Sequence, residues 1–251
     1  MKHNRASEPE LSPAPMARGA RLDGARDDVE FDQFAENYRQ VLDRGVAASG
    51  EDSTYFAEYK ARYLGRVLPR DFRGTILDFG CGIGLLANFL SRHFPESRLD
   101  GYDPSSESLA NVDPDLARRG TFRSRLDQLG NAYDLIVVAN VLHHVPPGER
   151  PKILAELAGR LAPGGRVAMF EHNPWNPATR WMVERCAFDK DAVLLPAGEA
   201  VGCFLSAQLE VERRDYIVFM PHFAAWLRRL EPWLAWLPMG AQYAVVGRRR
   251  T

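Results

Sequence analysis

From residue 75 onward, short apolar runs alternate with stretches of helical periodicity. The runs have the length and apolar content of strands, and they lie at 75–79, 98–102, 121–123, 134–139, 166–170, 216–220 and 243–246. Helical patterns at 85–93, 149–161 and 179–186 separate several of them. Alternating strands and helices form crossover units, which build a parallel sheet covered by helices on both faces. The pattern therefore predicts a three-layer α/β fold.

Upstream of this alternation, two stretches show the spacing of amphipathic helices. The first carries Phe31, Phe34, Ala35, Tyr38, Val41 and Leu42, and the second, at 54–67, carries Tyr55, Tyr59, Tyr63 and Leu64. A helix pair ahead of the first strand has no place in the crossovers of the sheet, so we expect it beside the carboxyl ends of the strands, where ligands bind. The predicted organisation is a disordered leader at 1–28, a helical cap at 29–68 and a main domain at 69–251.

Composition and charge narrow the classes of function. With 45% hydrophobic and 26% charged residues, the chain has the make-up of a globular protein. The formal net charge of −1 provides no basic field for nonspecific binding of nucleic acid or of an anionic membrane. The three cysteines are widely spaced, which argues against a disulfide framework or a cysteine zinc cage and fits a reducing cytoplasm. No segment reaches the ~20 apolar residues of a membrane span, and the first 28 residues lack the apolar run of a signal peptide.

The most informative segment is a glycine-rich turn between a predicted strand and a predicted helix. Asp78 is followed by Gly80, Gly82 and Gly84 at alternate positions. Glycine is needed where the backbone turns through conformations closed to other residues and where a ligand lies against the main chain. The alternative is a tight turn without a ligand. The setting of strand, turn and helix favours a ligand site.

A carboxylate at the end of the next predicted strand supports a nucleoside-type ligand. Asp103 can accept hydrogen bonds from both hydroxyls of an adenosine ribose. Asp78, ahead of the glycines, is suited to the ammonium group of an amino-acid moiety. The dinucleotide pattern G-x-G-x-x-G is not met, because position 85 is Leu. This spacing disfavours a nucleotide-dependent oxidoreductase.

With these residues the chain resembles the class I S-adenosylmethionine-dependent methyltransferases. Their D-x-G-x-G-x-G motif is matched at 78–84 and their ribose-binding acid at Asp103, and further likeness lies at 31–38, 133–145 and 161–167. The resemblance implies a Rossmann-like, seven-stranded, mostly parallel sheet whose last two strands form a reversed hairpin, here 216–220 and 243–246. It also implies S-adenosyl-L-methionine as cofactor, bound by Asp78, Gly80, Cys81, Gly82, Gly84, Asp103, Pro104 and Asn140.

One segment departs from the family pattern. After the third strand many members carry an Asp near the adenine, whereas Arg125 stands at the corresponding position of this chain. We therefore assign the adenine contacts to the neighbouring Leu126 and Asp127. The departure concerns the geometry around the adenine and leaves the identity of the cofactor unchanged.

Candidates for a general base follow the fourth and fifth predicted strands. They are His143 and His144, with Glu171 and His172 as further possibilities. A histidine titrates near neutrality and can take a proton from a hydroxyl. The alternative for this loop is a histidine that only caps the next helix or packs. Because no regular ligand spacing occurs among the four, we expect no metal.

An aromatic insert at 219–238 separates the last two predicted strands. It holds three of the five tryptophans, together with Arg228 and Arg229. Packing against the sheet is one explanation for its apolar residues. The other is weak peripheral contact with a membrane, or closure over an apolar substrate.

The leading functional hypothesis is methyl transfer to a small-molecule acceptor, with an apolar or lipid-linked one in view. The resemblance covers nucleic-acid methyltransferases as well, but the near-zero charge and the absence of an N-P-P-Y type segment argue against base methylation. The main alternative is a noncatalytic S-adenosylmethionine-binding or scaffold protein. A nucleotide-dependent oxidoreductase is a third and weaker hypothesis.

Overall fold

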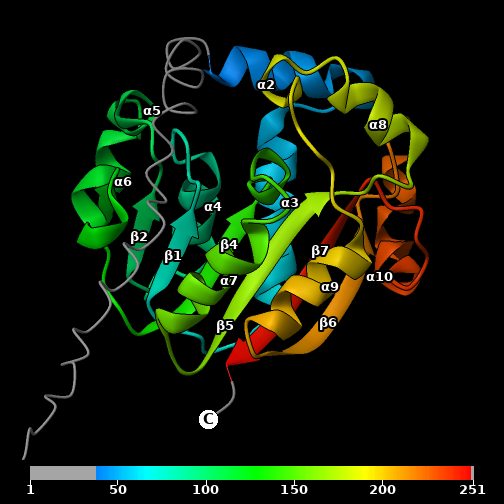
Figure 1. The fold of residues 1–251 in the computed structure, drawn as a ribbon. Helices are drawn as coiled ribbons and strands as arrows, with labels where there is room; N and C mark the ends of the chain where they lie inside the picture. The colour runs from blue at the N-terminus through cyan, green and yellow to red at the C-terminus, as the bar shows by residue number, and fades with distance from the viewer. Residues whose placement is uncertain (1–37, 250–251) are drawn as a thin grey trace, which may run out of the picture.

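The structure, a computed structural model, describes residues 38–249 and contains one seven-stranded sheet. Its strand order is β3-β2-β1-β4-β5-β7-β6 (Figure 1). The strands are β1 (Ile76–Phe79), β2 (Leu99–Tyr102), β3 (Thr121–Arg123), β4 (Tyr133–Ala139), β5 (Leu161–His172), β6 (Leu209–Ile217) and β7 (Gln242–Arg249). The first five pair in parallel, whereas β7 is antiparallel to both β5 and β6. The predicted three-layer sheet with a reversed C-terminal hairpin is therefore confirmed. The predicted leader at 1–28 and most of the 31–38 segment lie outside the described residues.

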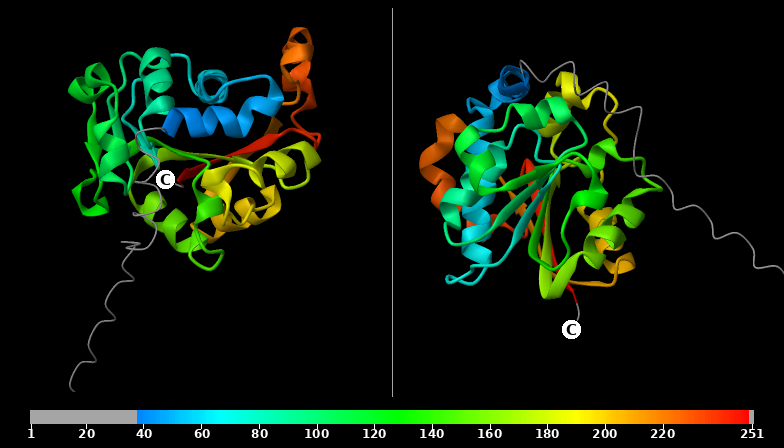
Figure 2. Two further views of the ribbon diagram at one scale, coloured as in Figure 1. Left: turned by 90° about the horizontal axis from the view of Figure 1, so that it is seen from above. Right: turned by 90° about the vertical axis from the view of Figure 1, so that its left-hand side faces the viewer.

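Helices cover both faces of the sheet, as the edge-on view in Figure 2 shows. The α-helices are α2 (Tyr38–Val46), α3 (Ser53–Val67), α4 (Leu85–His93), α5 (Ser106–Ala110), α6 (Pro114–Arg119), α7 (Arg150–Gly159), α8 (Pro177–Val183), α9 (Ala197–Ser206) and α10 (Glu231–Leu234). Short 3-10 helices are η2 (Ala47–Ser49), η3 (Leu126–Gln128), η4 (Leu142–His144), η5 (Ala187–Asp189) and η6 (His222–Leu230). Leu64 of α3 and Leu90 of α4 belong to the core on one face, and Leu154 of α7 and Phe204 of α9 to the core on the other.

The strands at the centre of the sheet read as nearly continuous apolar runs because both faces are buried. Ile136, Val137 and Val138 of β4 are each fully buried. Parallel strands covered by helices on both faces have this composition. The same burial explains why β1 and β4 were recognisable from the sequence to within one residue of their observed bounds.

The predicted strand at 216–220 is wrong in its bounds, because β6 ends at Ile217. Val218 has a left-handed φ of 60°, which breaks the extended backbone. The next two backbone N–H groups, of Phe219 and Met220, donate to Glu231 Oε1 at 3.0 and 2.9 Å rather than to a strand. The strand instead begins at Leu209 and runs through charged residues. It is the last strand of the sheet, so those side chains reach water.

The second helix of the predicted cap is part of the core. Asp52 caps α3 by accepting a hydrogen bond from Tyr55 N at 3.0 Å. Tyr63 then packs edge-on against Phe170 of β5, with ring centroids 5.6 Å apart. α3 therefore lies on the sheet, whereas α2 lies beyond the carboxyl ends of the strands (Figure 1). The division into a cap at 29–68 and a main domain at 69–251 stays a prediction.

The aromatic insert is attached to α3 through one buried carboxylate. Glu231 accepts a 2.8 Å hydrogen bond from Tyr59 Oη, in addition to the two backbone bonds from Phe219 and Met220. The tryptophan side chains of the insert face solvent instead of the sheet, since Trp226 is 70% and Trp233 79% exposed. Packing of these tryptophans on the sheet, the first explanation drawn from the sequence, is therefore wrong.

Candidate functional site

One cavity of about 670 Å³ lies at the carboxyl ends of the parallel strands. Its lining combines the glycine turn after β1, the end of β2, the loop after β4 and the end of β5 with side chains of α2, α3 and α8. Ligands of open α/β sheets bind in this position, outside the carboxyl ends of the strands. Of the residues singled out in the sequence, those that line it are Asp78, Gly80, Cys81, Asp103, Pro104, Leu126, Asn140, His143, His144 and His172.

The glycine turn is held open by backbone bonds to the neighbouring strand. The N–H groups of Gly80 and Cys81 both donate to Tyr102 O, at 2.7 and 2.9 Å. Gly80 has a φ of 77°, and a β-carbon there would come within 2.4 Å of Val141 Cγ2. A side chain at position 80 would therefore strain the backbone and crowd the wall of the cavity. Gly82 and Gly84 also have positive φ and shape the turn without lining the cavity themselves.

Asp78 presents a buried carboxylate with an open hydrogen-bonding position. The residue is 1% exposed, and its Oδ2 atom has no hydrogen-bond partner in the described part of the chain. Burial, helped by the nearby charge of Asp103, raises the pKa of Asp78 to about 7. An orphaned buried acceptor of this kind fits a ligand that brings a cation or a hydrogen-bond donor.

Asp103 is oriented by two backbone N–H groups. Gly82 N donates to Oδ2 at 2.7 Å, and Ser105 N donates to Oδ1 at 3.0 Å. The first of these bonds ties the carboxylate at the end of β2 to the glycine turn after β1. The turn and the acid, which are separate in the sequence, therefore form one rigid unit beside Pro104.

The remaining predicted cofactor contacts divide into two groups. Asn140 has a left-handed φ of 57°, and its Oδ1 atom is buried without a partner in the described structure. Leu126 lines the cavity as well. Asp127 does not: its exposed carboxylate pairs with Arg125 at 2.6 and 3.0 Å. The structure therefore gives no contact for an adenine at Asp127.

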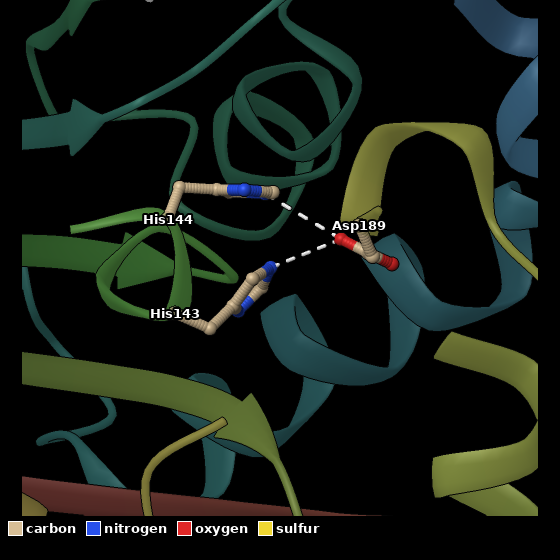
Figure 3. A group of neighbouring side chains, drawn as sticks. All are labelled: His143, His144 and Asp189. Carbon is tan, nitrogen blue, oxygen red and sulfur yellow. Dashed lines mark hydrogen bonds and ion pairs between the residues drawn. The ribbon is translucent and has the colours of Figure 1, made fainter. Parts of the chain in front are cut away.

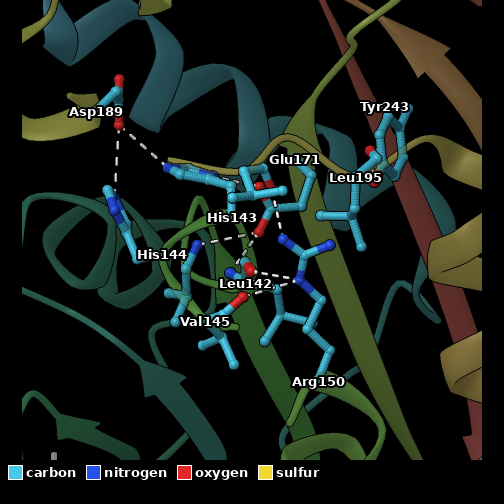
Figure 4. Close-up of polar contacts among 11 residues, drawn as sticks. Leu142, His143, His144, Val145, Arg150, Glu171, Asp189, Leu195 and Tyr243 are labelled. Atoms are coloured by element: carbon cyan, nitrogen blue, oxygen red, sulfur yellow. Dashed lines mark hydrogen bonds and ion pairs between the residues drawn. The ribbon is translucent and has the colours of Figure 1, made fainter. Parts of the chain in front are cut away.

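The two histidines after β4 occupy different electrostatic environments (Figure 4). His143 is buried between two carboxylates, with Nδ1 2.6 Å from Glu171 Oε2 and Nε2 3.2 Å from Asp189 Oδ1. Burial alone would lower the pKa of His143, but the two carboxylates outweigh it and raise the pKa to about 9. A protonated imidazole with both nitrogens engaged cannot accept a proton, so His143 is unsuited to be a free general base.

His144 and His172 stay neutral in the same cluster. Burial, with repulsion from the charged His143, lowers the pKa of each to about 4. His144 Nε2 lies 3.5 Å from Asp189 Oδ1, the oxygen that also faces His143 (Figure 3). Hydrogen bonding to His143 lowers the pKa of Asp189 to about 2, although its burial acts in the opposite direction. Two imidazoles and a carboxylate thus converge at the wall of the cavity.

Glu171 and Arg150 fix the backbone that carries these histidines. Glu171 Oε1 accepts the N–H groups of Val141 and Leu142 at 3.1 and 2.7 Å. The fully buried Arg150 donates from Nε to Leu142 O and Val145 O, both at 3.0 Å, and pairs with Glu199 at 2.6 Å (Figure 4). Glu171 was a candidate base in the sequence, but its buried carboxylate is engaged with His143 and the backbone. It acts as an anchor.

Two residues of the site had no signal in the sequence. Asp189 lies in η5, 45 positions after His144, and reaches the histidines only because the chain folds back over the cavity. Lys60 of α3 is 4% exposed, and burial lowers its pKa to about 8 against the opposing charges of Glu171 and Asp78. It is the single lysine or arginine among the described residues that line the cavity. In the sequence it was one charged position of an amphipathic helix.

Comparisons with known proteins agree with this geometry. Residues 77–167 match the family description of a methyltransferase domain. The chain is 30% identical over 129 residues to the trans-aconitate 2-methyltransferase of Pseudomonas paraeruginosa, covering 51% of this chain and 45% of that protein. It is 32% identical over 143 residues to the enzyme of the same name from Azoarcus sp. strain BH72, covering 53% and 55%. The chain spans about half the length of these curated relatives.

Solved structures show the same fold over most of the chain. The magnesium protoporphyrin IX methyltransferase of Synechocystis PCC 6803, with bound S-adenosylmethionine, superposes with a TM-score of 0.63 at 15% identity, covering 92% of this chain and 99% of that one. A methyltransferase of Archaeoglobus fulgidus gives a TM-score of 0.58 at 13% identity, covering 77% and 94%.

The matched domain, the relatives and the sheet topology together define the class. Residues 77–167 match a methyltransferase domain, and the sheet has the fold of solved S-adenosylmethionine-dependent methyltransferases, which supports that class and S-adenosylmethionine as cofactor. The resemblance drawn from the glycine turn and Asp103 is therefore confirmed. The hypothesis of a nucleotide-dependent oxidoreductase is set aside.

Proposed function

We propose that the protein transfers the methyl group of S-adenosylmethionine to an apolar small molecule. The observation that carries this proposal is the continuity of the cavity, in which the glycine turn and Asp103 lie at one end and a mostly apolar chamber with the histidine cluster at the other. A cofactor and an acceptor held next to each other in one cavity react without a diffusional step, and positioning of this kind contributes ~7–11 kcal/mol to catalysis.

The cofactor end offers carboxylates for the ammonium group and for the ribose hydroxyls of the cofactor. Asp78, whose Oδ2 lacks a partner, fits the ammonium group, and Asp103 fits the ribose hydroxyls. The turn at Gly80, Cys81, Gly82 and Gly84 lets the ligand lie against the main chain, while Pro104 and Leu126 offer apolar contact to the adenine. Asn140 offers its unpartnered Oδ1 near the methionine end. When bound, S-adenosylmethionine supplies a methyl group activated by a sulfonium.

The acceptor end is predominantly apolar. Its walls are formed by Phe56, Val145, Ile153, Met182, Val183 and Phe188. Trans-aconitate, after which the curated relatives are named, is a polycarboxylate, whereas Lys60 is the only lysine or arginine among the described lining residues. Burial of charges without partners is costly. The lining therefore favours an aromatic or aliphatic acceptor over a polycarboxylate.

We further propose that the histidine cluster holds the reacting group of the acceptor. His143 and His144 line the same cavity as the apolar side chains, and they are among the polar side chains that a hydroxyl of a bound apolar molecule would meet. Glu171 and Arg150 fix the positions of the histidines. Fixed positions are needed because the acceptor must be aligned with the methyl donor. This keeps both histidines in the catalytic site, with His143 as an orienting group.

An exposed aromatic surface next to the cavity suggests how an apolar acceptor arrives. All five tryptophans are exposed: Trp175, Trp181, Trp226, Trp233 and Trp236. The segment before α8 is tied to the insert, since Asn173 Nδ2 donates to Pro238 O at 3.2 Å. Tryptophans flanked by arginines such as Arg185, which stacks on Trp181, suit the interface of a lipid membrane. Within residues 38–249 no helix is long and apolar enough to cross a bilayer.

The decisive experiment for the function is a methyl-transfer assay with labelled S-adenosylmethionine. Hydroxylated aromatic and isoprenoid compounds are tested beside trans-aconitate, and calorimetry measures binding of the cofactor and of its demethylated product. We expect tight binding of both and label transfer to an apolar acceptor. Binding of the cofactor without transfer to any compound would favour the noncatalytic alternative, and transfer to trans-aconitate alone would contradict the apolar acceptor.

Liposome co-sedimentation tests the aromatic surface. Because their side chains are mostly exposed, Trp226→Ala and Trp233→Ala should change the free energy of unfolding by no more than ~0.5 kcal/mol. Sedimentation with vesicles of anionic lipid should fall in both variants. A wild-type protein that does not sediment with vesicles would remove the membrane proposal and leave the methyl-transfer proposal intact.

A further inference from the structure

We propose that His143, His144 and Asp189 form a binding site for a divalent metal ion of the zinc type, open to the acceptor end of the cavity. The expectation of no metal rested on sequence spacing, which could not include Asp189. In the folded chain one ligand atom of each residue lies within 4.8 Å of the other two. Figure 3 shows both imidazoles directed at the same carboxylate.

The distances match those between ligands of one small ion. Asp189 Oδ1 lies 3.2 Å from His143 Nε2 and 3.5 Å from His144 Nε2. Ligands bonded at ~2.0–2.2 Å to a tetrahedral ion lie roughly 3.3 Å from one another. Both distances from the carboxylate to an imidazole nitrogen are therefore close to the separation that a shared ion imposes, and the ligand atoms of the two histidines lie within 4.8 Å of each other.

His143 has a carboxylate on the ring nitrogen that does not face the proposed ion, as metal-bound histidines in other proteins commonly do. Its Nδ1 faces Glu171 Oε2 at 2.6 Å, which leaves Nε2 directed at the proposed ion. A carboxylate behind a histidine fixes the ring and makes the other nitrogen a better ligand. Glu171 is itself held by the N–H groups of Val141 and Leu142. An ion would take the place of the proton that His143 shares with Asp189.

The set of donors selects the class of ion. Two imidazole nitrogens and one carboxylate suit zinc, or iron, cobalt and nickel in their divalent states, whereas magnesium and calcium prefer oxygen ligands. Three protein ligands leave a further position free, as in open zinc sites. All three residues line the cavity, so the free position faces the acceptor. A hydroxyl or carboxylate oxygen of the acceptor is the natural occupant.

Ion binding is measured on the full-length protein without an affinity tag, after removal of metals with a chelator. Titration with Zn²⁺ alone in a calorimeter gives stoichiometry and affinity, and titration with Co²⁺ gives the visible absorption of a nitrogen- and oxygen-ligated ion. We expect one equivalent to bind. Glu171→Gln should weaken binding about 10–100-fold, and His144→Ala should weaken it further, because a ligand is removed.

Two controls separate loss of a ligand from loss of structure. His93→Ala removes a histidine of α4 that lies outside the cluster, and its affinity for Zn²⁺ should equal that of the wild type. Binding of S-adenosylhomocysteine reports that each variant is folded. Equal Zn²⁺ affinity of His144→Ala and wild type, or no uptake by the wild type, would overturn the proposal. Since no turnover is measured, this outcome is independent of the methyl-transfer assay.

Discussion

The two ends of the cavity differ in how the chain assembles them. The cofactor end is formed by two short segments, 78–84 and 103–105, that follow neighbouring parallel strands and are joined by the bond from Gly82 to Asp103. The acceptor end takes its polar groups from α3, from the loop after β4, from the end of β5 and from η5. One end is local in sequence and the other is not.

This difference has a physical origin. A backbone cradle needs glycines at fixed positions, because only glycine adopts positive φ without strain, so the cofactor end leaves a motif in the sequence. The charged groups of the acceptor end need only be brought together by the sheet and its helices. Asp189 and His143, 46 positions apart, illustrate this. Changes at the two ends should therefore have separable effects.

The largest effect is expected at Arg150. Replacing it with Met leaves the carbonyls of Leu142 and Val145 and the carboxylate of Glu199 without their buried donor. Each buried carbonyl left without a donor costs ~1–3 kcal/mol, whereas the loss of the pair with Glu199, whose side chain is 41% exposed, adds little. Urea denaturation should show this loss, and the fraction that remains folded should bind cofactor normally but lose turnover. Arg119→Met, on the exposed side of α6, is the matched control. Loss of cofactor binding in folded Arg150→Met would show that the two ends are coupled.

Asp78→Asn should weaken cofactor binding by ~1.5–3 kcal/mol, the range for a hydrogen bond to a charged group. The free energy of unfolding of this variant should instead increase near neutral pH, because the amide carries no buried charge. The folded pKa of Asp78 is about 7 against 3.8 in the unfolded chain, so the folded protein retains a proton that the unfolded chain has lost. Between these pH values the wild type therefore loses stability as pH rises, and the variant should lack this slope.

Denaturation at pH 5 and pH 8, with calorimetric titration of the cofactor at both, measures the two effects. Identical pH slopes in the wild type and in Asp78→Asn would show that the carboxylate titrates normally. The cofactor end would then lack the buried carboxylate of raised pKa by which we distinguish it from the acceptor end.

Gly80→Ala should lower the free energy of unfolding by ~1–3 kcal/mol, the cost of a strained left-handed residue. The added β-carbon also meets Val141 Cγ2, so cofactor affinity should fall as well. Gly202→Ala provides the control, since Gly202 lies in the interior of α9 with nothing within 4 Å of an added β-carbon. This control should gain ~0.5–1 kcal/mol. Equal changes in both variants would refute the special role of the turn.

The smallest effect is expected at Asp127. Because its carboxylate is exposed and outside the cavity, Asp127→Asn should change cofactor affinity and stability by no more than ~0.5 kcal/mol. Leu126→Ala, which removes a wall of the cavity, should weaken cofactor binding by more. The reverse order, measured by the same calorimetry, would mean that the adenine lies outside the cavity wall.

The sequence by itself determined the central strands, the glycine turn, Asp103 and hence the cofactor. Each of these depends on neighbours in the chain: burial on both faces makes a strand continuously apolar, and a turn against a ligand requires glycine. The sequence did not predict elements whose local composition was ambiguous. The charged edge strand β6 resembled a loop, and α9, with Gly198 and Gly202, lacked a strong helical pattern.

Only the tertiary structure decided the acceptor end. The charge of His143 depends on Glu171 and Asp189, which approach it from a strand end and from a distant turn. The same holds for Lys60, whose lowered pKa results from burial beneath the cavity. The exposure of the tryptophans was equally hidden, because an apolar stripe looks the same whether it faces a core or water. Electrostatic interactions and burial act through space, so they are fixed when the chain has folded and not by the order of its residues.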